Sequence, residues 1–120
     1  MSTRILIVDD YPTARKTVRS LLVWHSLEVC GEAENGKQAI EKVKRLKPDL
    51  VLLDINMPEM NGVQAAYEIR RIAPTTKIIF FTIHDSPETM SAAHLIVDGF
   101  VTKSDAGTKL IPEVKRLLNG

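Results

Sequence analysis

The chain contains RILIVDD at residues 4–10, LVLLD at 50–54, KIIFFT at 77–82 and GFVTK at 99–103. Each segment includes a short, nearly continuous apolar run, which is typical of a strand buried on both faces of a parallel sheet. The segment from Leu27 to Ala33 is a fifth strand-like run. Five strands of this kind predict an α/β domain, because parallel strands are joined by crossover helices that cover both faces of the sheet.

Apolar residues recur at helical spacing between these strands and after the last one. The first expected helix begins after Pro12. Four more are expected over residues 39–46, 63–72, 87–96 and 110–118. Turn-forming residues separate the helices from the strands. No linker or low-complexity tract interrupts the alternation of strands and helices, so the sequence predicts a single doubly wound domain.

Five polar side chains stand at the carboxyl ends of four predicted strands: Asp9, Asp10, Asp54, Thr82 and Lys103. In an open parallel sheet, ligands bind outside the carboxyl ends of the strands. These residues are distant in sequence, yet we expect them to converge at one edge of the sheet. Each of them alone is commonly a turn, strand-end or loop residue. Their joint placement is what indicates a site for metal-assisted phosphoryl chemistry.

The chemistry of the side chains fits this interpretation. Neighbouring carboxylates form a pocket of hard oxygen ligands that suits Mg²⁺, and a bound cation would relieve their mutual repulsion. Asp54 is the best candidate nucleophile because it stands alone at the end of a central-looking strand, and carboxylates form aspartyl-phosphate intermediates. Lys103 would place its positively charged ammonium group beside the phosphoryl oxygens. Thr82 would offer the same oxygens a hydroxyl donor.

Length and composition favour one domain that spans residues 1–120. The formal net charge of +1 gives no general reason to expect binding to nucleic acid or to a membrane surface. No apolar run approaches the ~20 residues that a membrane helix needs. Cys30 is the only cysteine, so an intrachain disulfide is excluded. The first apolar run ends in two acids and does not resemble a signal peptide. A cytoplasmic location is therefore the expectation.

The segments ILIVDD, LVLLDINMPEMNG, FFT and GFVTK, in this order and spacing, resemble the receiver domain of two-component response regulators. The resemblance covers essentially the whole chain and implies a flavodoxin-like (βα)5 sandwich with strand order 2-1-3-4-5. It also implies that Asp54 is the phosphoacceptor and that Lys103 contacts the phosphoryl group. The implied Mg²⁺ ligands are Asp9, Asp10, Asp54 and the backbone carbonyl of Asn56.

The same resemblance implies a conformational switch. Thr82 and Phe100 match the hydroxyl and the aromatic side chain that couple phosphorylation to an output surface, and a plain core role is the alternative for Phe100. Asn56 and His84 flank the site and are candidates for tuning the lifetime of the acyl phosphate. The implied activity is that of a signalling domain, not an enzyme, with at most self-catalysed phosphotransfer and autodephosphorylation.

The resemblance implies partners as well. The phosphoryl donor would be a sensor histidine kinase or a phosphotransfer protein. The motif GEAENG, and Ser-Asp after Lys103, resemble the subgroup that usually carries a C-terminal LuxR-type helix-turn-helix. Such a DNA-binding effector domain would lie outside these 120 residues. Homodimerisation is left open by the sequence.

Three other classes are alternatives. A receiver-like scaffold that is not phosphorylated would keep the fold, although the intact acids argue against it. A small Mg²⁺-dependent phosphatase of the aspartyl-phosphate type would need a second acid two residues after the nucleophile, where this chain has Asn56. A flavodoxin-like electron carrier would need a phosphate-binding loop after the first strand, where this chain has the acidic DDYPT.

One stretch departs from the family pattern. Leu95-Ile96-Val97-Asp98 stands where receivers usually place a small residue, often glycine, at the end of the fourth helix. A β-branched side chain resists the left-handed conformation that glycine adopts at such an end. We therefore expect this helix to end differently, and its apolar side chains to enlarge the output face as an exposed partner or dimer surface.

Overall fold

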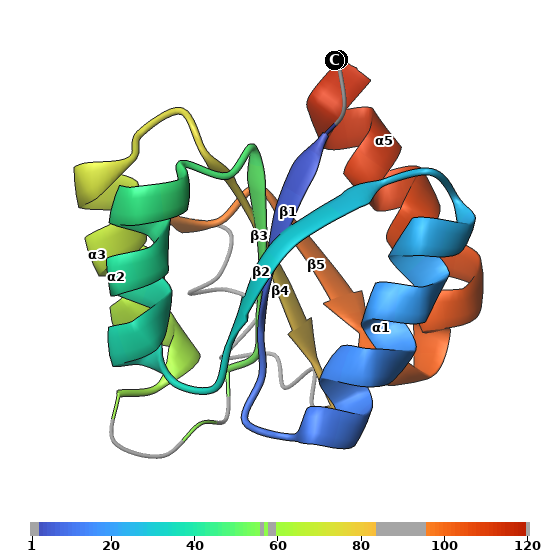
Figure 1. Cartoon of the computed structure of the whole chain (residues 1–120), viewed down its shortest axis with the longest axis horizontal. Coiled ribbons are helices and arrows are strands. Elements are labelled where there is room, and N and C mark those ends of the chain that lie inside the picture. The colour runs from blue at the N-terminus through green and yellow to red at the C-terminus, as the bar shows by residue number, and fades with distance from the viewer. Residues whose placement is uncertain (1–2, 56, 58–59, 84–95, 120) are drawn as a thin grey trace.

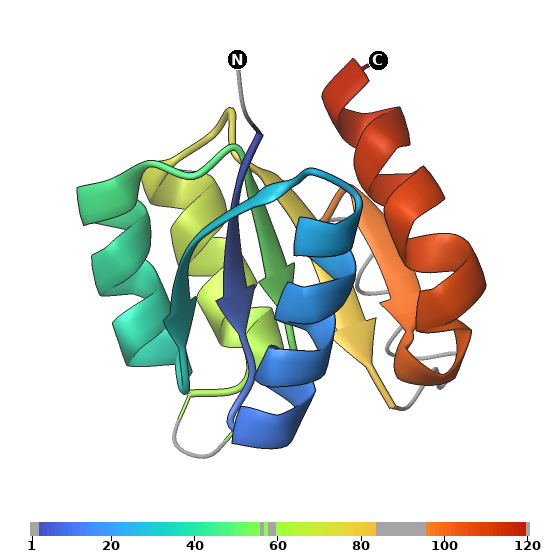
Figure 2. The ribbon, with the colours of Figure 1, turned by 45° about the vertical axis from the view of Figure 1, so that its right-hand side comes forward.

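A computed structural model of the chain describes residues 3–55, 57, 60–83 and 96–119. Its centre is a parallel five-stranded sheet with the order β2-β1-β3-β4-β5. The strands are β1 (Arg4–Val8), β2 (Glu28–Ala33), β3 (Leu50–Leu53), β4 (Lys77–Thr82) and β5 (Gly99–Thr102). Their carboxyl ends lie at the same edge of the sheet (Figure 2). The predicted flavodoxin-like α/β fold and its strand order are confirmed.

Helices cover both faces of the sheet. Among the described residues, the α-helices are α1 (Pro12–Trp24), α2 (Gly36–Leu46), α3 (Gly62–Ile72) and α5 (Ile111–Asn119), and a π-helical segment over Ala106–Leu110 precedes α5. Helices α2 and α3 lie on one face, and α1 and α5 lie on the other (Figure 1). No helix in the described ranges is long and apolar enough to cross a bilayer.

Burial on both faces explains the continuous apolar runs. Along β3, Val51 and Leu53 join the core beneath α2 and α3, whereas Leu50 and Leu52 join the core beneath α1 and α5. Successive side chains of a strand point to opposite faces, so each face needs its own apolar set. All four residues are at most 1% exposed. The polar residues that follow such strands are thereby carried to the carboxyl edge of the sheet.

Asparagine caps set where two helices begin. Asn35 Oδ1 accepts a hydrogen bond from the Gln38 amide at 2.8 Å, and α2 begins at Gly36, earlier than the apolar periodicity indicates. Asn61 Oδ1 accepts from the Gln64 amide at 3.0 Å, and the Gln64 side chain accepts from the Asn61 amide at 3.2 Å. Such caps satisfy amides that the helix itself leaves unpaired. The second cap therefore fixes where the loop after Asp54 ends.

The expected apolar surface around Leu95 to Val97 is not found where the structure describes it. Ile96 is 9% exposed and belongs to the core beneath α2 and α3, and Val97 packs against the same core. The prediction that these side chains form an exposed patch is therefore wrong for Ile96, and Val97 is partly buried. Leu95, and most of the helix predicted over residues 87–96, lies outside the described residues.

Long-range hydrogen bonds explain why this segment packs inward. Arg70 of α3 donates to the Ile96 carbonyl at 3.3 Å and to the Asp98 carboxylate at 2.6 Å. The same carboxylate accepts a hydrogen bond from the Ile78 amide at the start of β4, at 2.8 Å. Hydrogen bonds that involve a charged partner are the strong ones. They hold Ile96 and Asp98 against α3 and β4.

Candidate functional site

The ends of four adjacent strands bring the predicted polar residues to one edge. Val8 pairs with Leu53 across β1 and β3, so Asp9 and Asp54 emerge side by side. Thr82 at the end of β4 pairs with Thr102 at the end of β5. Lys103 follows directly, at the start of a short 3-10 turn over Lys103–Asp105.

Three carboxylates form a cluster at this edge. Asp9, Asp10 and Asp54 each offer an oxygen, and these oxygens lie within 4.8 Å of one another. Asp9 and Asp54 are only 3% and 5% exposed, while Asp10 is partly exposed. The ammonium group of Lys103 lies 2.5 Å from Asp9 Oδ2 and 3.8 Å from Asp54 Oδ2. One ammonium group balances only one of three carboxylates, so the cluster keeps an excess of negative charge that favours a cation.

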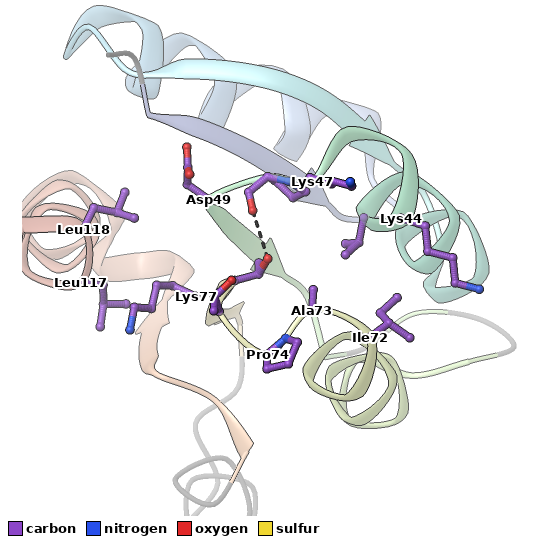
Figure 3. Close-up of a pocket in the computed structure, with 13 residues that line it drawn as sticks. Lys44, Lys47, Asp49, Ile72, Ala73, Pro74, Lys77, Leu117 and Leu118 are labelled. Atoms are coloured by element: carbon purple, nitrogen blue, oxygen red, sulfur yellow. Dashed lines mark hydrogen bonds between the residues drawn. The ribbon is translucent and has the colours of Figure 1, made fainter.

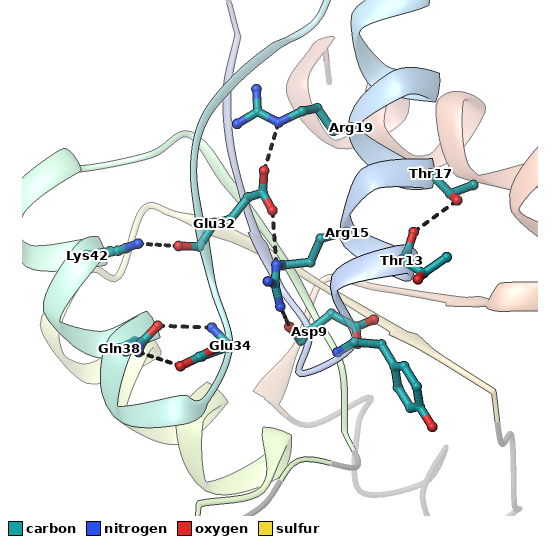
Figure 4. Close-up of polar contacts among 10 residues, drawn as sticks. Asp9, Thr13, Arg15, Thr17, Arg19, Glu32, Glu34, Gln38 and Lys42 are labelled. Carbon is teal, nitrogen blue, oxygen red and sulfur yellow. Dashed lines mark hydrogen bonds and ion pairs between the residues drawn. The ribbon is translucent and has the colours of Figure 1, made fainter.

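Asp9 is held from several sides. Its amide donates to the Ala33 carbonyl at 3.0 Å, and its Oδ1 accepts from the Tyr11 amide at 2.9 Å. Its own carbonyl oxygen accepts from Arg15 Nη1 at 2.6 Å (Figure 4). Together with the Lys103 contact, these bonds fix both the backbone and the carboxylate of Asp9. No sequence pattern predicts the contact of Arg15 with Asp9, because this contact depends on how far the Arg15 side chain reaches from the first turn of α1.

Thr82 and Phe100 lie at the β4–β5 side of this edge. Thr82 is fully buried, and its Oγ1 has no hydrogen-bond partner among the described residues. A buried hydroxyl without a partner is costly, so it is a group that a ligand or a rearrangement would satisfy. Phe100 is partly buried and meets Phe80 edge to face, with ring centroids 6.4 Å apart. Two further candidates, Asn56 and His84, lie outside the described residues.

Gly62 shapes the loop that follows Asp54. Its amide donates to the Ile55 carbonyl at 2.8 Å. A Cβ atom at position 62 would lie 2.2 Å from the Asp54 carbonyl oxygen and 2.6 Å from the Ile55 Cα. Only glycine allows this close approach of two backbone segments. The sequence marks Gly62 as a turn former, but the tight contact with the backbone of Asp54 comes from the structure.

Replacing Gly62 with alanine should therefore destabilise the fold by about 1–3 kcal/mol, the usual cost of overpacking. The backbone that must move is that of Asp54, so the amide resonances of residues 54 and 55 should shift as well. Urea unfolding and a ¹H–¹⁵N correlation spectrum measure the two effects. Gly107→Ala is the matched control, because a Cβ there meets nothing within 4 Å. Equal stability of the two variants would contradict the prediction.

A separate pocket lies at the opposite edge of the sheet (Figure 3). It has a volume of about 590 Å³ and lies between the ends of α2, α3 and α5. Its lining includes Lys44, Lys47, Asp49, Lys77 and Leu117. None of the clustered acids lines it. The cluster of three acids therefore lies at the carboxyl ends of the strands and is separate from this pocket.

Comparison with known proteins agrees with the geometry. The chain is 51% identical over 79 residues to a chemotaxis protein CheY of Thermotoga maritima, covering 66% of each chain. It superposes on a LuxR-family two-component response regulator from Aurantimonas sp. SI85-9A1 with a TM-score of 0.94 and 29% identity, covering 100% of this chain and 87% of the other. It also matches the response regulator TrrA of Thermotoga maritima, solved in complex with Mg²⁺ and BeF, with a TM-score of 0.88 and 36% identity over 96% of this chain and 98% of the other.

The match to a LuxR-family regulator agrees with the subgroup that the sequence resembles. The chain spans 66% of the length of the CheY relative and 58% of the VraR regulators of Staphylococcus that it also matches. A family model described as the response regulator receiver domain matches residues 5–115. This protein therefore belongs to the response regulator receiver domain family.

Proposed function

We propose that this receiver accepts one phosphoryl group on Asp54 in a Mg²⁺-dependent reaction and thereby switches an output surface. The observation that carries the proposal is the cluster of three carboxylates with Lys103 beside it. Asp54 is buried, follows the central strand β3, and lies 3.8 Å from the Lys103 ammonium group. The family match favours this signalling role over a phosphatase of the aspartyl-phosphate type.

The donor set fits a divalent metal ion. Asp9, Asp10 and Asp54 would hold Mg²⁺ through carboxylate oxygens, the hard ligands that this ion prefers. The backbone carbonyl of Asn56 is a further proposed ligand, which the resemblance to receivers supplies. The complex of TrrA with Mg²⁺ and BeF supports the same assignment. When bound, the ion would neutralise charge on the carboxylates and on the incoming phosphoryl oxygens.

The residues of this chain then have separate tasks. A carboxylate oxygen of Asp54 attacks the phosphorus of a phosphohistidine donor, an oxygen–phosphorus bond forms, and the nitrogen–phosphorus bond breaks with its electron pair returning to the imidazole. Lys103 turns from Asp9 to the new phosphoryl oxygens, which it contacts as a point charge. The Oγ1 atom of Thr82 donates a hydrogen bond to the same oxygens. Its buried hydroxyl thereby gains the partner that it lacks among the described residues.

The proposed switch follows from the movement of Thr82. Phe100 lies in the edge strand β5 and packs against the core, and space vacated near Thr82 would let its ring rotate inward. Phosphorylation adds ~1.5 to 2 negative charges at neutral pH, and it shifts the equilibrium only by its differential interaction with the two states. A shift from 1:99 to 99:1 requires about 5.5 kcal/mol. Asn56 and His84 are proposed to tune how long the acyl phosphate lasts.

The partners follow from the same role. The phosphoryl donor is a sensor histidine kinase or a phosphotransfer protein, and a LuxR-type DNA-binding domain is the proposed effector of a longer regulator. The resemblance to a LuxR-family structure supports this effector class. We also propose a cytoplasmic location for this regulator, and homodimerisation is a further proposal.

Phosphorylation by acetyl phosphate tests the function. The wild-type chain, incubated with acetyl phosphate and MgCl₂, should gain the mass of one phosphoryl group by intact-mass spectrometry, and EDTA should prevent the gain. Beryllofluoride titration, followed by amide chemical shifts, detects the same site when the adduct is short-lived. Failure of both would overturn the proposal and favour the unphosphorylated scaffold.

A further inference from the structure

Arg15 joins the acidic cluster to a second charged group on β2. Its Nη1 donates to the carbonyl oxygen of Asp9 at 2.6 Å, and its Nε donates to Glu32 Oε1 at 3.0 Å (Figure 4). The Arg15 side chain is 15% exposed and the Glu32 side chain 30%. The guanidinium group is planar and rigid, so one Arg15 side chain fixes two acceptors in a defined relation.

Glu32 is itself firmly anchored. Its second carboxylate oxygen accepts from Arg19 Nε at 2.8 Å, and its backbone carbonyl accepts from the ammonium group of Lys42. Hydrogen bonding to Arg19 and then to Arg15 lowers the pKa of the Glu32 carboxyl against the opposing effect of its burial. Glu32 is therefore a charged anchor at neutral pH, and Arg15 is tied to it and not only to Asp9.

The bond to the Asp9 carbonyl acts on the whole acidic pair. A peptide unit is planar, so fixing the carbonyl oxygen of Asp9 also fixes the direction in which the chain continues to Asp10. The Lys103 contact to Asp9 would be given up when the ammonium group turns to phosphoryl oxygens. The Arg15 contact is made to the backbone, and it can persist through that exchange.

The charge of Arg15 does not by itself explain why this side chain lies beside the acidic pair. A guanidinium group near a cation site repels the cation, so charge alone would make Arg15 unfavourable for metal binding. We propose that Arg15 is a positioning residue, which holds the Asp9–Asp10 peptide against Glu32 and thereby preorganises the carboxylates for Mg²⁺. This inference rests on the proposed function. Groups that orient metal ligands typically account for 10–100-fold in metal affinity.

Titration with MgCl₂ tests the inference, with the amide cross-peaks of Asp10 and Asp54 as the readout. Arg15→Met keeps much of the side-chain length but removes both hydrogen bonds and the charge. Positioning predicts that its Kd for Mg²⁺ rises by about 10-fold. Loss of charge alone predicts a lower Kd. A Kd equal to or below that of the wild type would therefore overturn the inference.

Two variants separate positioning from general structural damage. Arg19→Met removes the other guanidinium group from Glu32 but leaves Asp9 untouched, and its Mg²⁺ affinity should match the wild type. Arg15→Lys keeps the charge, but one ammonium group replaces a fork that reaches both acceptors, so its Kd should rise as well. An Arg15→Lys protein that binds Mg²⁺ like the wild type would overturn the inference even if Arg15→Met failed to fold.

The rate of phosphorylation by acetyl phosphate gives a second readout. If Arg15 acts through metal binding, the Arg15 variants should regain the wild-type rate at saturating Mg²⁺, and the loss should appear only at low Mg²⁺. A rate that stays low at saturation would overturn the inference. Absence of any Mg²⁺-dependent shift in the wild-type protein would instead overturn the proposed function itself.

Discussion

Replacing Asp54 with asparagine should abolish the gain of a phosphoryl group from acetyl phosphate. The amide has nearly the shape of the carboxylate, and the site is closely packed, with the Asp54 side chain 7% exposed. An amide oxygen, however, lacks the negative charge and the nucleophilicity that form an acyl phosphate. Intact-mass spectrometry after incubation with acetyl phosphate and MgCl₂ should show a complete loss relative to the wild type.

The control for this substitution is an acid at the same edge that does not belong to the cluster. The carboxylate of Asp105 accepts from Thr102 Oγ1 at 3.0 Å and lies 3.5 Å from the Lys109 ammonium group. Asp105→Asn should therefore be phosphorylated like the wild type. A phosphoryl adduct that survives in Asp54→Asn would place the acceptor on another residue, and peptide mapping would then identify it.

The convergence of the site was predictable because few physical rules set it. Continuous apolar runs identify strands buried on both faces, and parallel strands end at a common edge. Asp9, Asp54 and Lys103 follow three such runs directly, so their proximity needs no knowledge of side-chain packing. The contacts of Lys103 with both acids agree with this expectation.

Other features depend on contacts that periodicity does not encode. Apolar periodicity predicts that α2 and α3 begin at residues 39 and 63, whereas they begin at Gly36 and Gly62 because polar caps, and not apolar residues, set the starts. The sequence predicts Ile96 at the surface, but this residue is buried because an ion pair between Arg70 and Asp98, 28 residues apart, holds the segment. Such long-range pairs become visible only when the chain is folded.

Arg15 illustrates the same limit within the site. Its position after the acidic pair gives no reason to connect it with Glu32, which is 17 residues away on strand β2. The connection arises because α1 packs beside β2 and turns this side chain across the end of β1 (Figure 4). Sequence patterns thus find the groups that react, whereas the groups that orient them emerge from the fold.

The buried hydroxyl of Thr82 leads to a prediction with an unusual sign. Thr82→Val should stabilise the unphosphorylated protein by about 1–2 kcal/mol, because it removes a buried polar group that has no partner among the described residues. Thr76 is the matched control, since it is also buried but its Oγ1 donates to the Pro48 carbonyl at 3.1 Å. Thr76→Val should lower stability by about 1 kcal/mol. Urea unfolding of both variants measures the opposite signs.

The same substitution should uncouple phosphorylation from the switch. Thr82→Val keeps Asp54 and the acidic pair, so it should still bind beryllofluoride in the presence of Mg²⁺. The valine side chain would have no hydroxyl to donate a hydrogen bond to the bound beryllofluoride. The change in the amide chemical shift of Phe100 that beryllofluoride should cause in the wild type should therefore be lost in Thr82→Val. Destabilisation of Thr82→Val like that of Thr76→Val would mean that the hydroxyl is already bonded in the resting state. The gain of a partner would then no longer explain why phosphorylation draws Thr82 toward Asp54.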